Sequence, residues 1–206
     1  MNPKDVRRDW AERSGEFSPT YYAHRGPDET SELLREVFEH YVGQDAEILE
    51  LGCSAGRHLA HLREHGFENL TGIDINDEAF EVMAEEYPVL HERGTFLTGA
   101  IEDIVPGFDD GQFDAVYSVE TLQHIPPEDT WVFEDIARVT DELLVTVENE
   151  GNGAERGREG AEVSYVNDEF PLYHRNWEDV FSALGAVQLL CEPGERDTLR
   201  AFRSME

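Results

Sequence analysis

Small and acidic residues near the middle of the chain have the types and spacing of a nucleoside-binding site. Gly52, Ser54 and Gly56 form a turn between an apolar run that ends on Glu50 and a helical pattern. A strand, a small-residue turn and a helix bring bare backbone N–H groups and the positive end of a helix up to a ligand. Glycine suits such a turn, because a side chain would block close approach or require an unfavourable φ.

Asp74 is the second chemical signal. It ends the apolar run of residues 70–73 and lies 24 residues after Glu50. An acid at the end of a second strand can accept hydrogen bonds from two ribose hydroxyls, so the pair of signals indicates a nucleoside cofactor. Gly52, Ser54 and Arg57 do not fit the dehydrogenase pattern G-x-G-x-x-G, because its second and third glycines are missing.

Four segments in order resemble class I S-adenosylmethionine-dependent methyltransferases. Glu50-Leu51-Gly52-Cys53-Ser54-Ala55-Gly56 is similar to that family's E-x-G-x-G-x-G signature, with Ser54 at the middle glycine. The other three segments are Gly72-Ile73-Asp74-Ile75, Gly99-Ala100-Ile101-Glu102-Asp103-Ile104 and Phe113-Asp114-Ala115-Val116-Tyr117-Ser118-Val119. The resemblance covers residues 48–147 and continues more weakly to the end. The resemblance implies methyl transfer by in-line displacement at a sulfonium methyl, with the protein positioning the acceptor.

The resemblance also implies which residues would contact S-adenosylmethionine. Those expected at the cofactor are Glu50, Gly52, Cys53, Ser54, Gly56, Asp74, Ile75, Ala100, Ile101, Glu102 and Ser118. Of these, Glu50, Gly52 and Ser118 would flank the methionine end and Asp74 the ribose. Family members often carry Asp or Ser where this chain has Ala100. A bond to the adenine amine would therefore come from elsewhere, with Glu102 as one candidate and the Ile101 backbone as the safer one.

His124 follows the fourth segment and is the candidate catalytic residue. Its imidazole could take a proton from the substrate. Alternatively, it bonds the backbone and shapes the loop, an interpretation favoured because methyl transfer to a good nucleophile needs positioning more than a base. The loop lacks the prolyl-aromatic clamp of nucleobase amino-methyltransferases. The candidate substrate residues are aromatic or ionisable, and they are Tyr21, Tyr22, His24, Arg25, Tyr165, Tyr173 and His174.

No metal is expected. Histidines at positions 58, 61 and 65 share a helical face, but three ligands on one straight helix cannot all converge on one ion. Glu148 and Asn149 end the fifth expected strand, where catechol-type methyltransferases hold a metal. Ser118, however, stands where the fourth strand would need its acid.

The charge of the chain indicates its surroundings more than its partners. Its 46 Asp and Glu residues against 16 Lys and Arg residues give a formal charge of −30, and Lys4 is the only lysine. Carboxylates hold water and cations, while concentrated salt screens their repulsion, so the sequence resembles that of a halophilic archaeon. A nucleic-acid substrate is unlikely by this measure, because a basic groove would have only Arg25, Arg156, Arg158 and Arg175 to draw on.

The 206 residues and 39% hydrophobic content suit one domain with a modest elaboration. No run approaches the ~20 apolar residues of a membrane span. The first ten residues lack the apolar stretch of a signal peptide, which predicts a cytoplasmic protein with no membrane partner. The oligomeric state stays open.

The apolar patterns, together with the resemblance to class I methyltransferases, imply a Rossmann-like, doubly wound α/β fold with a seven-stranded, mostly parallel sheet and an antiparallel C-terminal edge. One domain is expected over residues 1–206. Residues 1–42 would form an N-terminal arm and a helix, and residues 46–206 the cofactor-binding core with a substrate loop over 150–177. The aromatic arm, residues 1–27, either covers the sheet edge or closes over the site as a lid.

The expected function is therefore methyl transfer from S-adenosylmethionine to a small-molecule substrate. Two alternatives remain. An RNA or protein methyltransferase would need a surface for its larger substrate, and a non-catalytic binding protein would keep the cofactor site and lose the substrate pocket. Residue types alone do not decide whether oxygen, nitrogen, carbon or sulfur accepts the methyl.

Overall fold

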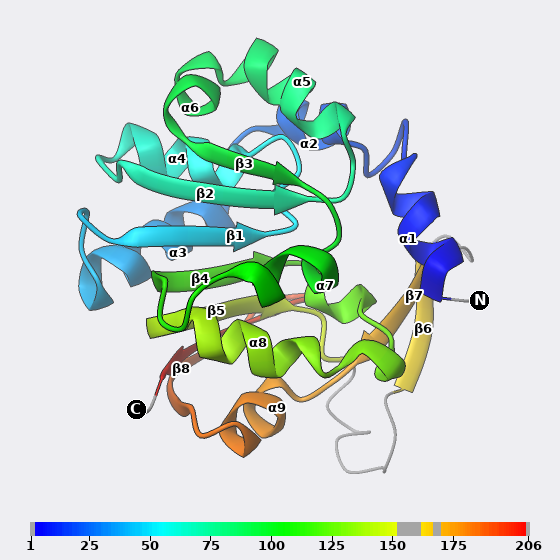
Figure 1. Cartoon of the computed structure of the whole chain (residues 1–206), viewed down its shortest axis with the longest axis vertical. Coiled ribbons are helices and arrows are strands. Elements are labelled where there is room, and N and C mark those ends of the chain that lie inside the picture. Colours follow the sequence, from blue (N-terminus) through cyan, green and yellow to red (C-terminus); the bar gives the residue numbers. More distant parts are fainter. Residues whose placement is uncertain (1–2, 152–161, 167–169, 205–206) are drawn as a thin grey trace.

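A seven-stranded sheet forms the centre of the computed structural model, which describes residues 3–151, 162–166 and 170–204. The strand order is β3-β2-β1-β4-β5-β9-β8 (Figure 1). Neighbouring strands from β3 to β5 run parallel, whereas β9 runs antiparallel to both β5 and β8. The expected doubly wound, mostly parallel sheet with an antiparallel C-terminal edge is confirmed.

The strands of this sheet are β1 (Glu47–Leu51), β2 (Asn69–Asp74), β3 (Thr95–Thr98), β4 (Phe113–Val119), β5 (Thr140–Glu148), β8 (Val187–Pro193) and β9 (Thr198–Arg203). A separate two-stranded sheet pairs β6 (Glu162–Val166) with β7 (Phe170–His174). The α-helices are α1 (Pro3–Ala11), α2 (Pro19–Arg25), α3 (Glu29–Tyr41), α4 (Arg57–Glu64), α5 (Glu78–Glu86), α6 (Pro88–Arg93), α7 (Ile101–Ile104), α8 (Val132–Val139) and α9 (Trp177–Ala183).

Alternation along the strands builds two apolar layers, one on each face of the sheet. Ile48 of β1 and Tyr117 of β4 belong to the core beneath α3 and α4, with Phe38 of α3 among the buried residues. The intervening Leu49 and Val116 belong to the opposite core, beneath α8 and α9. Side chains alternate faces with period two, so both faces of a central strand are apolar.

The chain after β2 forms two consecutive helices. The apolar pattern of residues 77–87 predicts a helix, which α5 confirms, and a second helix, α6, follows it directly. Pro88 is the first residue of α6, where its missing N–H is not needed, so the proline that ends one helix starts the next.

The N-terminal arm and the small sheet lie at the same end of the molecule. Figure 1 shows α1 beside β6 and β7, past the carboxyl ends of β1 and β2. Ligands of open parallel sheets bind in this place, outside the carboxyl ends of the strands. No helix in the described part of the chain is both long and apolar enough to cross a membrane.

Candidate functional site

The turn between β1 and α4 requires glycine for two structural reasons. Gly52 and Gly56 have φ of 72° and 79°, and Ser54 between them also has a positive φ, of 50°. A Cβ on Gly52 would lie 2.3 Å from Thr121 Oγ1, and one on Gly56 would lie 2.7 Å from Met83 Cε. Backbone conformation and crowding by the protein itself therefore both require these glycines.

Asp74 connects this turn to the end of β2. Its Oδ2 accepts a hydrogen bond from the Ser54 N–H at 2.7 Å, and its Oδ1 accepts one from the Asn76 N–H at 2.8 Å. Burial raises the pKa of Asp74 to about 6 despite these two bonds. Each oxygen keeps a second acceptor position. The carboxylate therefore lines the cavity in a fixed orientation and can still accept two hydroxyls.

The buried Glu50 carboxyl is a group that could bind a cation in the cavity. Its side chain lines the same cavity, although the residue is only 1% exposed. Among the described residues, Oε2 has no hydrogen-bond partner. Burial raises the pKa of this carboxyl to about 8. A buried carboxylate oxygen without a partner is costly, and the ammonium group of a methionine moiety is the kind of donor that would satisfy it.

The expected adenine side of the site also lies along the cavity. Ile75, Ala100, Ile101 and Glu102 all contribute to its lining. The Glu102 carboxylate already forms an ion pair with Arg7 at 2.9 Å. This pairing ties Glu102 to the arm, so the Ile101 backbone remains the more accessible group for a purine edge.

Two other expected cofactor residues differ in placement. Cys53 lines the cavity, and its Sγ lies over Gly72, where an added Cβ would approach it to 2.6 Å. Ser118 is buried and is not part of the lining. Its Oγ donates a hydrogen bond to Glu148 Oε1 at 2.7 Å. Ser118 therefore supports the floor of the site through Glu148.

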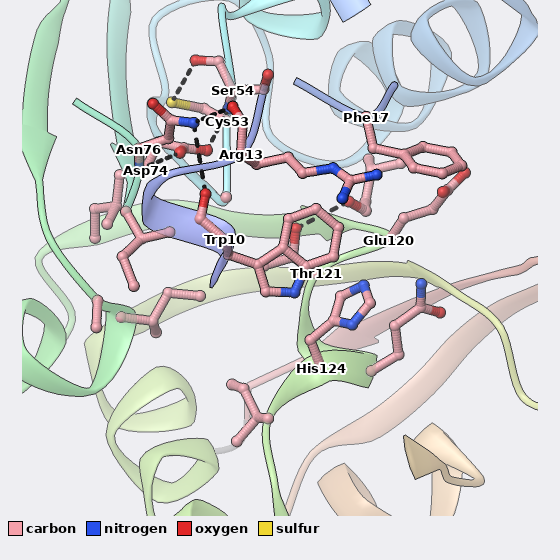
Figure 2. Close-up of a pocket in the computed structure, with 18 of the residues that line it drawn as sticks. Trp10, Arg13, Phe17, Cys53, Ser54, Asp74, Asn76, Glu120, Thr121 and His124 are labelled. Carbon is pink, nitrogen blue, oxygen red and sulfur yellow. Dashed lines mark hydrogen bonds between the residues drawn. The ribbon is translucent and has the colours of Figure 1, made fainter. Parts of the chain in front are cut away.

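The N-terminal arm covers this cavity. Val6, Arg7, Trp10, Arg13, Phe17, Pro19 and Tyr22 all line it. The Asn76 amide donates to the carbonyls of Trp10 and Arg13, at 3.5 and 3.1 Å (Figure 2). Arg7 also forms an ion pair with Asp129 at 2.6 Å. Of the two interpretations of the arm, the arrangement favours the one in which it closes over the site.

His124 lies in the cavity wall opposite the arm. Its ring meets the Trp10 indole edge-on at 4.7 Å between centroids (Figure 2). Its Nδ1 lies 3.1 Å from the Pro171 carbonyl oxygen, so Nδ1 carries the proton and Nε2 is the acceptor. Burial lowers the pKa of His124 to about 4. The imidazole is therefore neutral at pH 7, with a basic nitrogen available.

Of the seven expected substrate residues, only Tyr22 lines the cavity. Tyr21, His24 and Arg25 lie on α2 outside the lining, with the Arg25 guanidinium over the Tyr21 ring. Tyr165 is 54% exposed. Tyr173 packs against Arg175, and His174 contacts Ser164 Oγ at 2.7 Å.

Pairing of β6 with β7 explains this outcome. Ser164 faces Leu172 and Val166 faces Phe170, whereas Val163 faces Tyr173. One face of the hairpin therefore presents Val166 and Leu172 to the cavity, and the other presents the tyrosines outward. Period-two alternation would have separated these sets had residues 162–174 been recognised as a hairpin. Residues 152–161 of the expected substrate loop, with Arg156 and Arg158, lie outside the described residues.

Groups able to bind a metal lie elsewhere in the described part of the chain. The two sets whose ligand atoms fall within 4.8 Å of one another are Glu32, His61 and His65, and Asp114, Asp141 and Glu142. None of these six residues lines the cavity. The ionisable groups along the cavity include carboxylates, the imidazoles of His58 and His124, and the guanidinium groups of Arg7, Arg13, Arg57 and Arg196.

Comparison with known proteins agrees with this geometry. The family model described as "Methyltransferase domain" matches residues 48–142, the span that holds Glu50, Asp74 and His124. This segment is similar to a methyltransferase domain. The chain is 30% identical over 112 residues to mouse EEF1A lysine methyltransferase 2, a match covering 49% of this chain and 45% of that protein. It is also 30% identical over 136 residues to Arabidopsis thaliana 24-methylenesterol C-methyltransferase 2, covering 62% and 35% respectively.

The fold of this chain recurs in solved structures. One is 1,6-didemethyltoxoflavin-N1-methyltransferase from Burkholderia thailandensis, solved with bound 1,6-didemethyltoxoflavin and S-adenosylhomocysteine. The TM-score is 0.74 at 15% identity, with 100% of this chain and 92% of that chain covered. Together the likenesses support an S-adenosylmethionine-dependent methyltransferase with S-adenosylmethionine as its cofactor. The chain spans less than half the length of the two curated relatives, whose names give different substrates.

Proposed function

We propose that this chain transfers the methyl group of S-adenosylmethionine to a small-molecule acceptor that gives up a proton to His124. The observation that carries the proposal is the cavity itself. It joins Glu50 and Asp74 at the strand ends to His124, and the arm crosses over it. A roof of protein over the reacting groups suits an acceptor that can be enclosed, because closure excludes water and fixes the acceptor.

The residues that would hold the cofactor follow from their chemistry. Asp74 would accept the ribose hydroxyls, Glu50 would pair with the ammonium group, and Ala100 and Ile101 would contact the adenine. When bound, the cofactor supplies an electrophilic methyl on a sulfonium. The protein has to hold the acceptor atom in line with that methyl, ~3 Å away.

His124 would act on the acceptor. Its Nε2 accepts, because Nδ1 donates to the Pro171 carbonyl, and its low pKa keeps it neutral. An acceptor with an O–H or N–H group becomes a better nucleophile as that proton moves to Nε2. His124→Gln should therefore lower kcat while leaving the affinity for S-adenosylhomocysteine within about twofold. Because a pKa of about 4 makes His124 a weak base at neutral pH, the loss should lie toward the low end of the roughly 10²–10⁴-fold range of general bases.

The experiment that tests the acceptor class uses S-adenosylmethionine with a labelled methyl. The protein is incubated separately with a low-molecular-mass metabolite extract, total RNA and a protein fraction. We expect label in the metabolite extract alone. Label in the protein fraction would instead support an activity like that named for the mouse relative, and label in none would support a non-catalytic binding protein.

Asp74→Ala tests the cofactor site independently. Loss of two charge-assisted hydrogen bonds should weaken S-adenosylmethionine binding by about 2–3 kcal/mol in a calorimetric titration. Unchanged affinity would remove Asp74 from the site. Preferential binding of NAD in the same titration would contradict the proposed cofactor.

We also infer that the chain works in the salt-rich cytoplasm of a halophilic archaeon. The formal charge of −30 and the single lysine support this inference.

A further inference from the structure

The carboxylate of Glu148 is buried at the carboxyl end of β5 and gathers four donors from one neighbouring segment. Its Oε1 accepts from Ser118 Oγ at 2.7 Å and from the N–H groups of Thr121 and Leu122 at 3.2 and 3.0 Å. Its Oε2 accepts from the Gln123 N–H at 3.2 Å. One side chain thus satisfies three consecutive backbone amides and a hydroxyl of the strand before them.

Those amides belong to the segment that carries the chemistry of the site. Glu120, at the start of this segment, has a φ of 51°, a left-handed conformation that costs energy outside glycine. Thr121 lies against Gly52 in the β1–α4 turn, and His124 ends the segment with its ring in the cavity. A shift of this loop would move both residues.

The next residue of the chain continues the same arrangement. The Asn149 N–H donates to Gln123 Oε1 at 2.7 Å, so the end of β5 holds the loop from two consecutive positions. Among the described residues, Glu148 forms no ion pair within 4.0 Å. Its lone pairs are directed at N–H and O–H donors of the loop, which leaves no converging set of oxygens for a cation.

We propose that Glu148 is a positioning residue, which fixes the 120–124 loop so that His124 Nε2 faces the acceptor. This rests on the proposed role of His124 as the proton acceptor. An ionised carboxylate can accept from all four donors at once, because it has acceptor positions on both oxygens. Burial raises the pKa of Glu148 to about 7, while the four hydrogen bonds favour the ionised form. Glutamine must turn an NH₂ group toward at least one N–H, and alanine leaves every donor without a partner.

The test compares Glu148→Gln and Glu148→Ala with Glu142→Gln, a matched change near the exposed start of the same strand. Amide hydrogen exchange, followed by NMR, reports on the loop without any substrate. We expect faster exchange at Thr121, Leu122 and Gln123 in both Glu148 variants, and no change there in Glu142→Gln. Wild-type protection in Glu148→Ala would overturn the proposal.

A kinetic cycle then decides whether the loop acts through His124. With the acceptor fraction labelled by the wild-type protein, Glu148→Gln should lower kcat about tenfold, which corresponds to 1.4 kcal/mol. Its affinity for S-adenosylhomocysteine should stay near the wild-type value. Adding Glu148→Gln to His124→Gln should cost nothing further. Equal losses in both backgrounds would overturn the positioning role, whereas a fully active His124→Gln would overturn the proposed function and leave the exchange result to stand alone.

Discussion

Glu50 is buried and Asp74 is half-buried. Both carboxyl groups line the cavity from neighbouring strands, and their pKa values differ. Glu50 pairs in register with Gly72, so its carboxyl lies close to the end of β2. Burial raises the pKa of Glu50 to about 8 and that of Asp74 to about 6. At pH 7 the empty site therefore holds Glu50 mainly protonated and Asp74 mainly ionised.

Binding of S-adenosylhomocysteine should consequently release a proton near neutral pH. Its ammonium group favours the ionised form of Glu50 and so lowers the pKa of that carboxyl. Affinity should rise as pH increases from 6 to 8, since less work is then needed to remove the proton. Calorimetry in buffers of different ionisation enthalpy measures this release. Glu50→Gln should abolish it, and pH-independent binding by the wild-type protein would contradict the assignment.

Sequence reasoning placed Glu50, Gly52 and Asp74 at one site, where they line the cavity, and missed most of the other lining residues for a physical reason. Glu50, Gly52 and Asp74 lie within single strand–turn units, whose geometry local spacing determines. Trp10 and Leu172 reach the cavity only because α1 and the β6–β7 hairpin dock there. That docking depends on contacts between segments far apart in the chain, which spacing along one segment does not encode.

Among the elements, α1 differs from the helices that pack on the sheet. The Asn76 side-chain amide donates hydrogen bonds to the carbonyl oxygens of Trp10, in α1, and of Arg13, just beyond it. Arg7 of the same helix forms an ion pair with Glu102. The Trp10 ring also lies 4.4 Å from the Phe170 ring of β7, measured between centroids. Coverage of the cavity by α1 thus depends on a few polar contacts and on the Trp10 indole.

Trp10→Ala should weaken closure of the arm and lower turnover by about tenfold, since removal of the half-buried indole and its aromatic contacts costs about 1 kcal/mol or more. S-adenosylhomocysteine binding should remain measurable, because Glu50 and Asp74 are untouched. Trp131→Ala is the control, as Trp131 is 45% exposed and lies outside the cavity lining. Both rates are measured with the labelled acceptor fraction. Full activity in Trp10→Ala would make the arm a structural cover only.

The whole molecule combines a conventional apolar core with a strongly acidic exterior. The sheet and its helices were predictable, because each central strand contributes to both cores and each long helix shows one apolar face. What composition could not indicate is how the few cations are used. Arg7, Arg57 and Arg200, for example, each pair with one or more carboxylates, which leaves most of the acidic surface unneutralised.

Stability should therefore depend on salt well beyond the range of simple screening. Thermal melts between roughly 0.1 and 3 M KCl should show the midpoint rising throughout, whereas the Debye length already falls to about 3 Å at 1 M. Self-repulsion of the −30 charge is the reason at low salt, and hydration by carboxylates at high salt. A flat response would contradict the halophilic inference.

Asn76 forms hydrogen bonds with both Asp74 and the arm, so binding at Asp74 and docking of the arm are linked. Its backbone N–H donates to Asp74, while its side-chain amide donates to two carbonyls of the arm. If docking of the arm favours retention of the cofactor by some factor, then the cofactor must favour docking by that same factor. Tight retention of the cofactor and rapid exchange of its product therefore place opposite demands on the hydrogen bonds of Asn76. The rate at which the arm departs then sets an upper limit on the turnover number.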